Sequence, residues 1–113
     1  MIIVSKNISI PELNEMAGKM FGNLVKAVVD IDRGVMAVDG ELHADEEALL
    51  IENGSEQKYL WGINIYPELK GDDFIEFDSM INLRPSSGNQ SRGVDDETIR
   101  KKILAIANKL IVK

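Results

Sequence analysis

The side chains with the clearest potential for chemistry lie in a polar loop that reads RPSSGNQSRGV, from residue 84 to residue 94. The loop joins a predicted strand to a predicted helix, and free backbone N–H groups at a helix N-terminus attract anions. An arginine stands near each end, and its planar fork can hold two oxygens of a carboxylate or phosphate. We therefore predict an anion-binding loop formed by Arg84, Asn89, Ser91 and Arg92.

The same loop also fits a purely structural or interface role. The helix predicted after it begins with Asp95, Asp96 and Glu97, which compete with an anion for the positive end of the helix dipole. The loop also lacks the lysine and the spacing of a phosphate-binding P-loop. In this alternative, Arg92 anchors the loop by pairing with a carboxylate of Asp95, Asp96 or Glu76.

A second group of candidates could supply acid–base chemistry. His43 is the only histidine, and it would share one face with Asp39 and Glu41 if a strand continued that far. A carboxylate–imidazole group of this kind could act as a general base or bind zinc or manganese. A metal site usually needs another nitrogen or sulfur ligand, so we predict no metal. The alternative is a histidine at a helix start that makes a structural hydrogen bond.

Two carboxylates lie two residues apart on the polar face of a predicted strand. The Cα atoms of Glu76 and Asp78 would be roughly 7 Å apart, a spacing that suits a hard cation or an acid–base pair. Arg84 could instead neutralise both carboxylates across the sheet. His43 and Asp78 are therefore the candidate catalytic residues, and each has a structural alternative.

Periodicity in the sequence predicts the elements that position these side chains. Alternating patterns predict strands over residues 60–66 and 74–85. Short apolar runs predict strands over residues 2–4, 24–31 and 35–42, the last two joined in a hairpin by the turn at residues 32–34. Helical spacing predicts helices that begin at the N-caps Ser9, Asp45 and Asp95. The result is one α+β domain over residues 1–113 with the order β-α-β-β-α-β-β-α. We expect two layers, a mainly antiparallel sheet with helices on one face.

The same patterns assign side chains to the core. The first helix should bury Leu13, Met16, Ala17, Met20 and Phe21, and the last should bury Ile99, Ile103, Ile106, Ala107 and Leu110. In the strand predicted over residues 74–85, odd positions from Ile75 to Leu83 form the apolar face. The polar face consists of the even positions from Glu76 to Arg84, including Met80 and Asn82. Asn64 and Tyr66 of the preceding strand should lie on the same face.

Composition excludes several classes of protein. The chain has 113 residues, 44% of them hydrophobic, and no cysteine, so it can form one domain without disulfide or thiolate chemistry. A net charge of −6 argues against nucleic-acid binding, and no apolar run approaches the ~20 residues of a membrane span. The N-terminus lacks the features of a signal peptide. We expect a cytoplasmic protein without a cofactor, a nucleic-acid partner or a membrane partner.

Four runs extend over nearly the whole chain: KAVVDIDRGVMAVDGELHAD, LWGINIYP, FIEFDSMINLRP and GNQSRGVDD. Together they resemble a family of small prokaryotic proteins of unknown function. The resemblance implies a bacterial or archaeal cytoplasmic protein. It implies no activity and no catalytic residues.

Two functional hypotheses follow from the sequence. The first is a non-catalytic binding or regulatory module that associates into a homodimer, because no complete catalytic set is present and a small sheet tends to bury its free edges. The second is a small hydrolase or transferase acting on an anionic metabolite, phosphorylated or carboxylated. In that enzyme Arg84 and Arg92 would bind the anion, and His43 or Asp78 would be the base.

Overall fold

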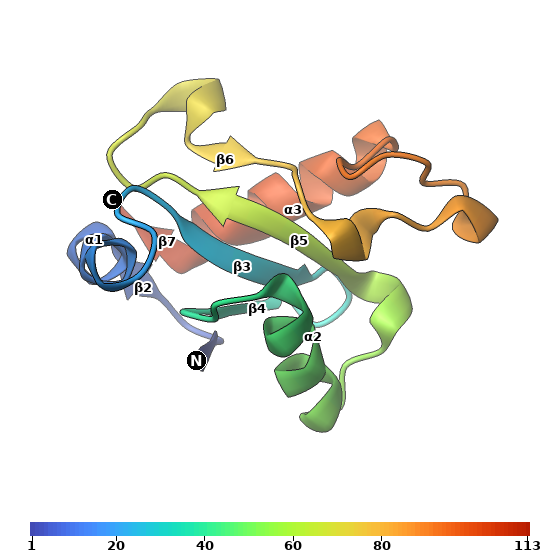
Figure 1. The fold of residues 1–113 in the computed structure, drawn as a ribbon, viewed down its shortest axis with the longest axis horizontal. Helices are drawn as coiled ribbons and strands as arrows, with labels where there is room; N and C mark the ends of the chain where they lie inside the picture. The colour runs from blue at the N-terminus through green and yellow to red at the C-terminus, as the bar shows by residue number, and fades with distance from the viewer.

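Five antiparallel strands form the central sheet of the protein (Figure 1). The computed structural model describes all 113 residues. Across the sheet the strands follow the order β1 (Ile2–Val4), β4 (Val35–Val38), β3 (Val25–Asp30), β5 (Leu60–Ile65) and β6 (Ile75–Glu76). The α+β class and the mainly antiparallel sheet are thus confirmed. None of the helices is long and apolar enough to cross a membrane.

Helices cover both faces of the sheet, so the prediction that all of them share one face is wrong. Helices α1 (Ile10–Lys19) and α3 (Glu97–Leu110) pack on one face, and α2 (His43–Glu52) packs on the other (Figure 1). The reason lies in β3, where Ala27 and Val29 face α3 while Val28 faces α2. Because β3 is apolar on both faces, helices can pack against each of them.

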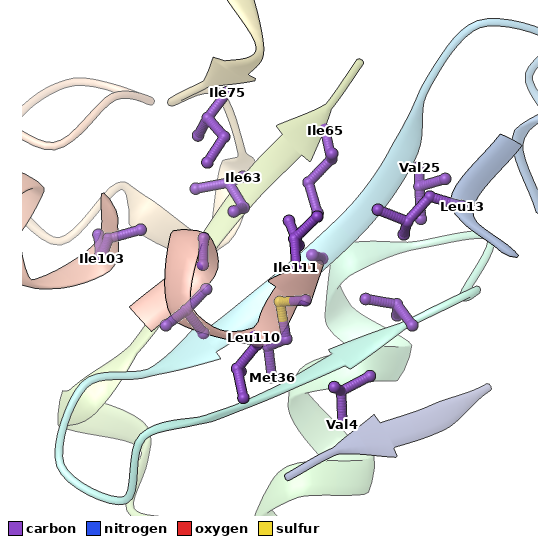
Figure 2. Close-up of a cluster of buried hydrophobic side chains, with 14 of the residues drawn as sticks. Val4, Leu13, Val25, Met36, Ile63, Ile65, Ile75, Ile103, Leu110 and Ile111 are labelled. Atoms are coloured by element: carbon purple, nitrogen blue, oxygen red, sulfur yellow. The ribbon is translucent and has the colours of Figure 1, made fainter. Parts of the chain in front are cut away.

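The larger core lies between the sheet and the helices α1 and α3 (Figure 2). It contains 19 buried residues, among them Leu13, Met36, Ile63 and Ile103. A short parallel pair closes this core, formed by β2 (Ile8–Ser9) and β7 (Ile111–Val112). The sequence did not indicate this pair, because two-residue strands carry no periodic signal. A smaller cluster under α2 contains Val28, Ala37, Leu50 and Leu60.

The helix starts were predicted with mixed success. The capping box of α1 is confirmed, because the Ser9 hydroxyl accepts the Glu12 N–H and the Glu12 carboxylate accepts the Ser9 N–H. Helix α2 begins at His43, with Leu42 rather than Asp45 as its N-cap. The N-cap of α3 is Asp96 rather than Asp95.

The core assignments from helical spacing also divide. In α3, Ile103, Ala107 and Leu110 are buried as predicted, and Ile99 and Ile106 pack partly buried against the same core. In the first helix the prediction fails for Met20 and Phe21, which are exposed. The helix ends at Lys19, so the spacing no longer places these two side chains on the core face.

The strand predicted over residues 74–85 is the largest error. Only Ile75–Glu76 pair with β5, and the chain then makes a 3₁₀ turn at Met80–Asn82. The alternation consequently breaks, since Leu83 is exposed and Asn82 is fully buried. Asn64 and Tyr66 do join Glu76 on one face, as predicted. Both donate hydrogen bonds to its carboxylate, at 2.9 Å and 3.0 Å.

Candidate functional site

Along part of the outer edge of β5, side chains supply the hydrogen bonds that the backbone of a neighbouring strand would otherwise make. The N–H of Gly62 donates to Oδ1 of Asn82 at 2.8 Å, and Nδ2 of Asn82 donates to the Gly62 carbonyl at 2.9 Å. Two residues before Gly62 on the same strand, the Leu60 carbonyl accepts a hydrogen bond from the guanidinium of Arg84. The edge of β5 is therefore satisfied by an amide and a guanidinium where backbone pairing would otherwise be needed.

Asn89 organises the interior of the predicted anion loop. Its Nδ2 donates to the carbonyls of Asn82, Ser91 and Gly93 at 2.7, 3.1 and 2.9 Å, and its Oδ1 accepts the Asp95 N–H at 2.8 Å. Asn89 is buried, and its polar atoms are all engaged within the loop. The amide therefore holds the loop in shape and offers no free group to a ligand.

Ser91 also bonds within the loop. Its hydroxyl donates to Asp95 at 2.6 Å and accepts the Gly93 N–H at 3.1 Å. The bond from Ser91, together with the Gln90 N–H, lowers the pKa of the Asp95 carboxyl below its ordinary value. Asp95 thus braces the loop, and the next residue, Asp96, caps the helix.

Arg92 is engaged by a carboxylate of the protein. Its Nε forms an ion pair with Oδ1 of Asp78 at 2.8 Å, and both side chains are about half exposed. Pairing with a carboxylate was the structural alternative for Arg92, although the partner is Asp78 and not Asp95, Asp96 or Glu76. Of the four predicted anion-binding residues, Arg84 and Asn89 line a common cleft, and Ser91 and Arg92 do not.

Arg84 is held rigidly at one wall of this cleft. Its guanidinium lies over the Trp61 ring, 4.4 Å from the centroid, and donates to the carbonyls of Ile81, Lys58 and Leu60. No carboxylate oxygen lies within ion-pair distance of it. Partial burial lowers the pKa of Arg84, an effect that the charge of nearby Glu47 opposes.

The cleft has a volume of about 860 Å³ and opens beside the edge of β5. Its walls come from α2, the segment 57–58, β5, the segment 80–89 and the start of α3. Two lining residues carry buried polar atoms without a hydrogen-bond partner, Nε1 of Trp61 and Oε2 of Glu47. Burial raises the pKa of the Glu47 carboxyl, whereas the charge of Arg84 and a hydrogen bond from the Gln57 side chain lower it. These unpartnered atoms distinguish the cleft from an ordinary surface hollow.

His43 makes the structural hydrogen bond that was the alternative to a catalytic role. The residue is buried at the start of α2, and its Nε2–H donates to the Ile63 carbonyl at 2.8 Å. Burial lowers the pKa of the ring, so His43 is neutral near pH 7. The strand β4 ends at Val38, so Asp39, Glu41 and His43 do not share a strand face.

The charges of Asp78 and Arg92 both act on the pKa of His43, so the three residues lie near one another. They line neither the large cleft nor the second hollow, which has a volume of about 450 Å³. No three His, Asp or Glu side chains are grouped so that they could share a metal ion. A reaction centre that combines the predicted base with Arg84 is therefore not assembled.

Sequence reasoning missed three features of this region. Glu47 and Lys58 join the cleft from segments far from the loop, and Trp61 stacks on Arg84. Glu46, the neighbour of Glu47, is fully buried against Gly40, and burial raises its pKa to about 9. Nothing in the sequence of this acidic helix distinguishes Glu46 and Glu47 from glutamates that are exposed to solvent.

Comparisons with known proteins identify a family without an assigned activity. No curated protein and no solved structure matches the chain significantly. The model of a family described as a protein of unknown function, DUF5674, matches residues 2–110. Because the match covers nearly the whole chain, the protein belongs to the DUF5674 family.

Proposed function

We propose that this protein is a non-catalytic binding module whose cleft takes a small anionic ligand, carboxylated or phosphorylated. The observation that carries the proposal is the guanidinium of Arg84, half-buried in the cleft with no carboxylate at ion-pair distance. Lys58, whose ammonium lies over the Tyr59 ring, adds a second cation that forms no ion pair. The volume of about 860 Å³ suits a small molecule, since such sites span roughly 300–1,000 Å³.

Arg84 is suited to binding because its position is already fixed. Three of its five N–H groups donate to backbone carbonyls, which leaves two for a ligand. A guanidinium immobilised before binding loses little side-chain entropy when an anion arrives. The stacking on Trp61 limits its motion further.

The hydrolase or transferase hypothesis has less support. It requires a base that reaches a bound anion, and neither His43 nor Asp78 lines the cleft. Asp78 is also engaged with Arg92. A binding role needs only the groups that the cleft already contains.

The test uses Trp61, the only tryptophan, as a fluorescent reporter within the cleft. Titration with inorganic phosphate and with benzoate should give a saturable change in emission for at least one of them. Lys58→Gln should weaken that binding about fivefold, which corresponds to ~1 kcal/mol for an exposed charge. Lys19→Gln, the same change on α1 outside the cleft, is the matched control. An absent response to both anions, or equal weakening by both variants, contradicts the proposal.

We also propose that the module forms a homodimer through β1. This strand is at one end of the sheet, so its outer edge has no partner strand, and Met1 and Ile2 are exposed beside it. Free edges of this kind favour pairing with a second copy. Light scattering should return twice the monomer mass of 12.6 kDa, and Ile2→Lys should shift the protein to monomer. The monomer mass for the parent at high concentration contradicts the dimer.

The sequence phrases that resemble small prokaryotic proteins support a bacterial or archaeal origin and a location in the cytoplasm. Fractionation of cells that express the protein with a small epitope tag tests the location. Recovery in the membrane or extracellular fraction contradicts it.

A further inference from the structure

The cleft contains acidic groups as well as cations. Glu47 contributes a carboxyl group whose Oε2 is buried without a hydrogen-bond partner, while the side chain of Gln57 is a hydrogen-bond donor to the same carboxyl. Asp96 contributes a second carboxylate, although its Oδ1 already accepts the Thr98 and Ile99 N–H groups as the cap of α3. The four charged side chains of the cleft thus comprise two cations, Lys58 and Arg84, and two acids.

The presence of both cations and acids in the cleft determines which charges a ligand should carry. A simple anion drawn to Arg84 and Lys58 would leave Oε2 of Glu47 without a donor and would add negative charge near it. A simple amine would satisfy Glu47 and would meet two cations. A ligand with one ammonium and one carboxylate satisfies both sides of the cleft.

The cleft also presents an apolar surface. Met80 and Leu83 are 62% and 41% exposed, and the partly buried Ile81 and Ile99 continue the same lining. Exposed methionine and leucine beside a polar group are typical of a site that covers an apolar ligand part. An apolar side chain on the ligand would remove this surface from water.

We propose that the cleft binds a free α-amino acid with an apolar side chain. Its ammonium group donates to Glu47, its carboxylate accepts from Lys58 and Arg84, and its side chain lies on Met80 and Leu83. This inference rests on the proposed binding function, because it names the ligand class of the same cleft. Trp61 Nε1–H is buried beside this cleft and has no partner in the protein.

The experiment compares four probes that differ by one group each, using Trp61 emission and calorimetry on the full chain. L-Leucine carries all three features; 4-methylpentanoate lacks the ammonium, 3-methylbutylamine lacks the carboxylate, and glycine lacks the apolar side chain. We expect leucine to bind at least about tenfold more tightly than each of the other three. Binding of 4-methylpentanoate as tight as that of leucine overturns the role of Glu47, and equal binding of glycine overturns the apolar contact.

Two variants assign the contacts. Glu47→Gln should abolish the preference for leucine over 4-methylpentanoate, whereas Lys58→Gln should weaken both of these ligands. Glu52→Gln, a change at an exposed position of the same helix, is the control and should preserve the preference. A preference that survives Glu47→Gln overturns the inference.

The outcomes separate this inference from the proposed function. If phosphate or benzoate binds in a Lys58-dependent manner while leucine has no advantage over 4-methylpentanoate, the cleft is an anion site and only the amino-acid inference fails. If none of the probes or anions binds, both fail. The comparison of probes uses the parent protein, so it does not depend on whether any variant folds.

Discussion

Glu46 should make the stability of this protein depend on pH in a way that one substitution removes. The side chain is fully buried, its Oε2 accepts the Gly40 N–H at 2.9 Å, and its Oε1 has no partner. Burial raises its pKa from 4.5 to about 9. The folded protein therefore holds Glu46 protonated at neutral pH, whereas the unfolded chain ionises it.

The magnitude follows from this difference. Because the folded pKa lies above the unfolded value, the contribution to stability is complete below about pH 4.5 and is lost as the pH rises toward 9. Each pH unit in that window removes about 1.4 kcal/mol. At pH 7, about 2.5 units above 4.5, the loss is about 3 kcal/mol.

Glu46→Gln should remove this loss, because glutamine stays neutral and its Oε1 can still accept the Gly40 N–H. The free energy of unfolding should match that of the parent near pH 4 and exceed it by about 3 kcal/mol at pH 7. Urea unfolding monitored by Trp61 emission at several pH values measures both proteins. The difference between them isolates Glu46 from the other groups that titrate.

Glu52→Gln is the matched control, since it removes a carboxylate from an exposed position of the same helix and should change stability little. A difference between Glu46→Gln and the parent that stays constant from pH 4 to pH 8 would refute the reasoning. It would mean that Glu46 is ionised in the folded protein or reaches solvent.

Three other changes test the fold and one tests the loop. Asn82→Ala should lower the free energy of unfolding by about 2–4 kcal/mol, since it leaves buried backbone groups of the β5 edge unpaired; a loss under ~0.5 kcal/mol in chemical denaturation would argue against this clamp. Ile103→Ala should cost about 2–5 kcal/mol by opening a cavity in the larger core, and a near-parental melting curve would contradict its burial. Ser9→Ala should cost about 0.5–2 kcal/mol through the lost N-cap, measured in the same way, and equal curves would count against it. Arg92→Ala breaks an exposed pair with Asp78, so stability should stay within about 1 kcal/mol and anion binding monitored by Trp61 should persist; abolished binding would restore Arg92 to the site.

Local sequence determined the elements whose signals are local. The capping box of Ser9 and Glu12 sets the start of α1, because the groups that bond are three residues apart. The 3.6-residue spacing of Ile103, Ala107 and Leu110 sets the buried face of α3. A run rich in Val and Ala sets most of β3, and the alternation of Trp61, Ile63 and Ile65 sets β5. Each of these follows from backbone geometry within one element, so the α+β class could be predicted.

Placement of α2 could not be predicted, because the sequence signal was symmetric. Five of the six β3 residues are buried, so both faces of that strand are apolar and either could receive a helix. The tertiary structure places α2 on the face of Val28 and Ala37. Burial of Glu46 and the raised pKa of Glu47 follow from that placement alone.

The candidate site was likewise decided by the tertiary structure. Sequence reasoning found Arg84 and Asn89, two of the residues that line the cleft, but grouped them with Ser91 and Arg92 on the assumption of a regular strand before the loop. Instead, β6 ends at Glu76, Asn82 and Arg84 use their side chains to satisfy the edge of β5, and Arg92 pairs with Asp78. Alternation in a sequence reports which side chains are apolar, and it cannot report whether a backbone carbonyl will meet another backbone or a side chain from a distant segment.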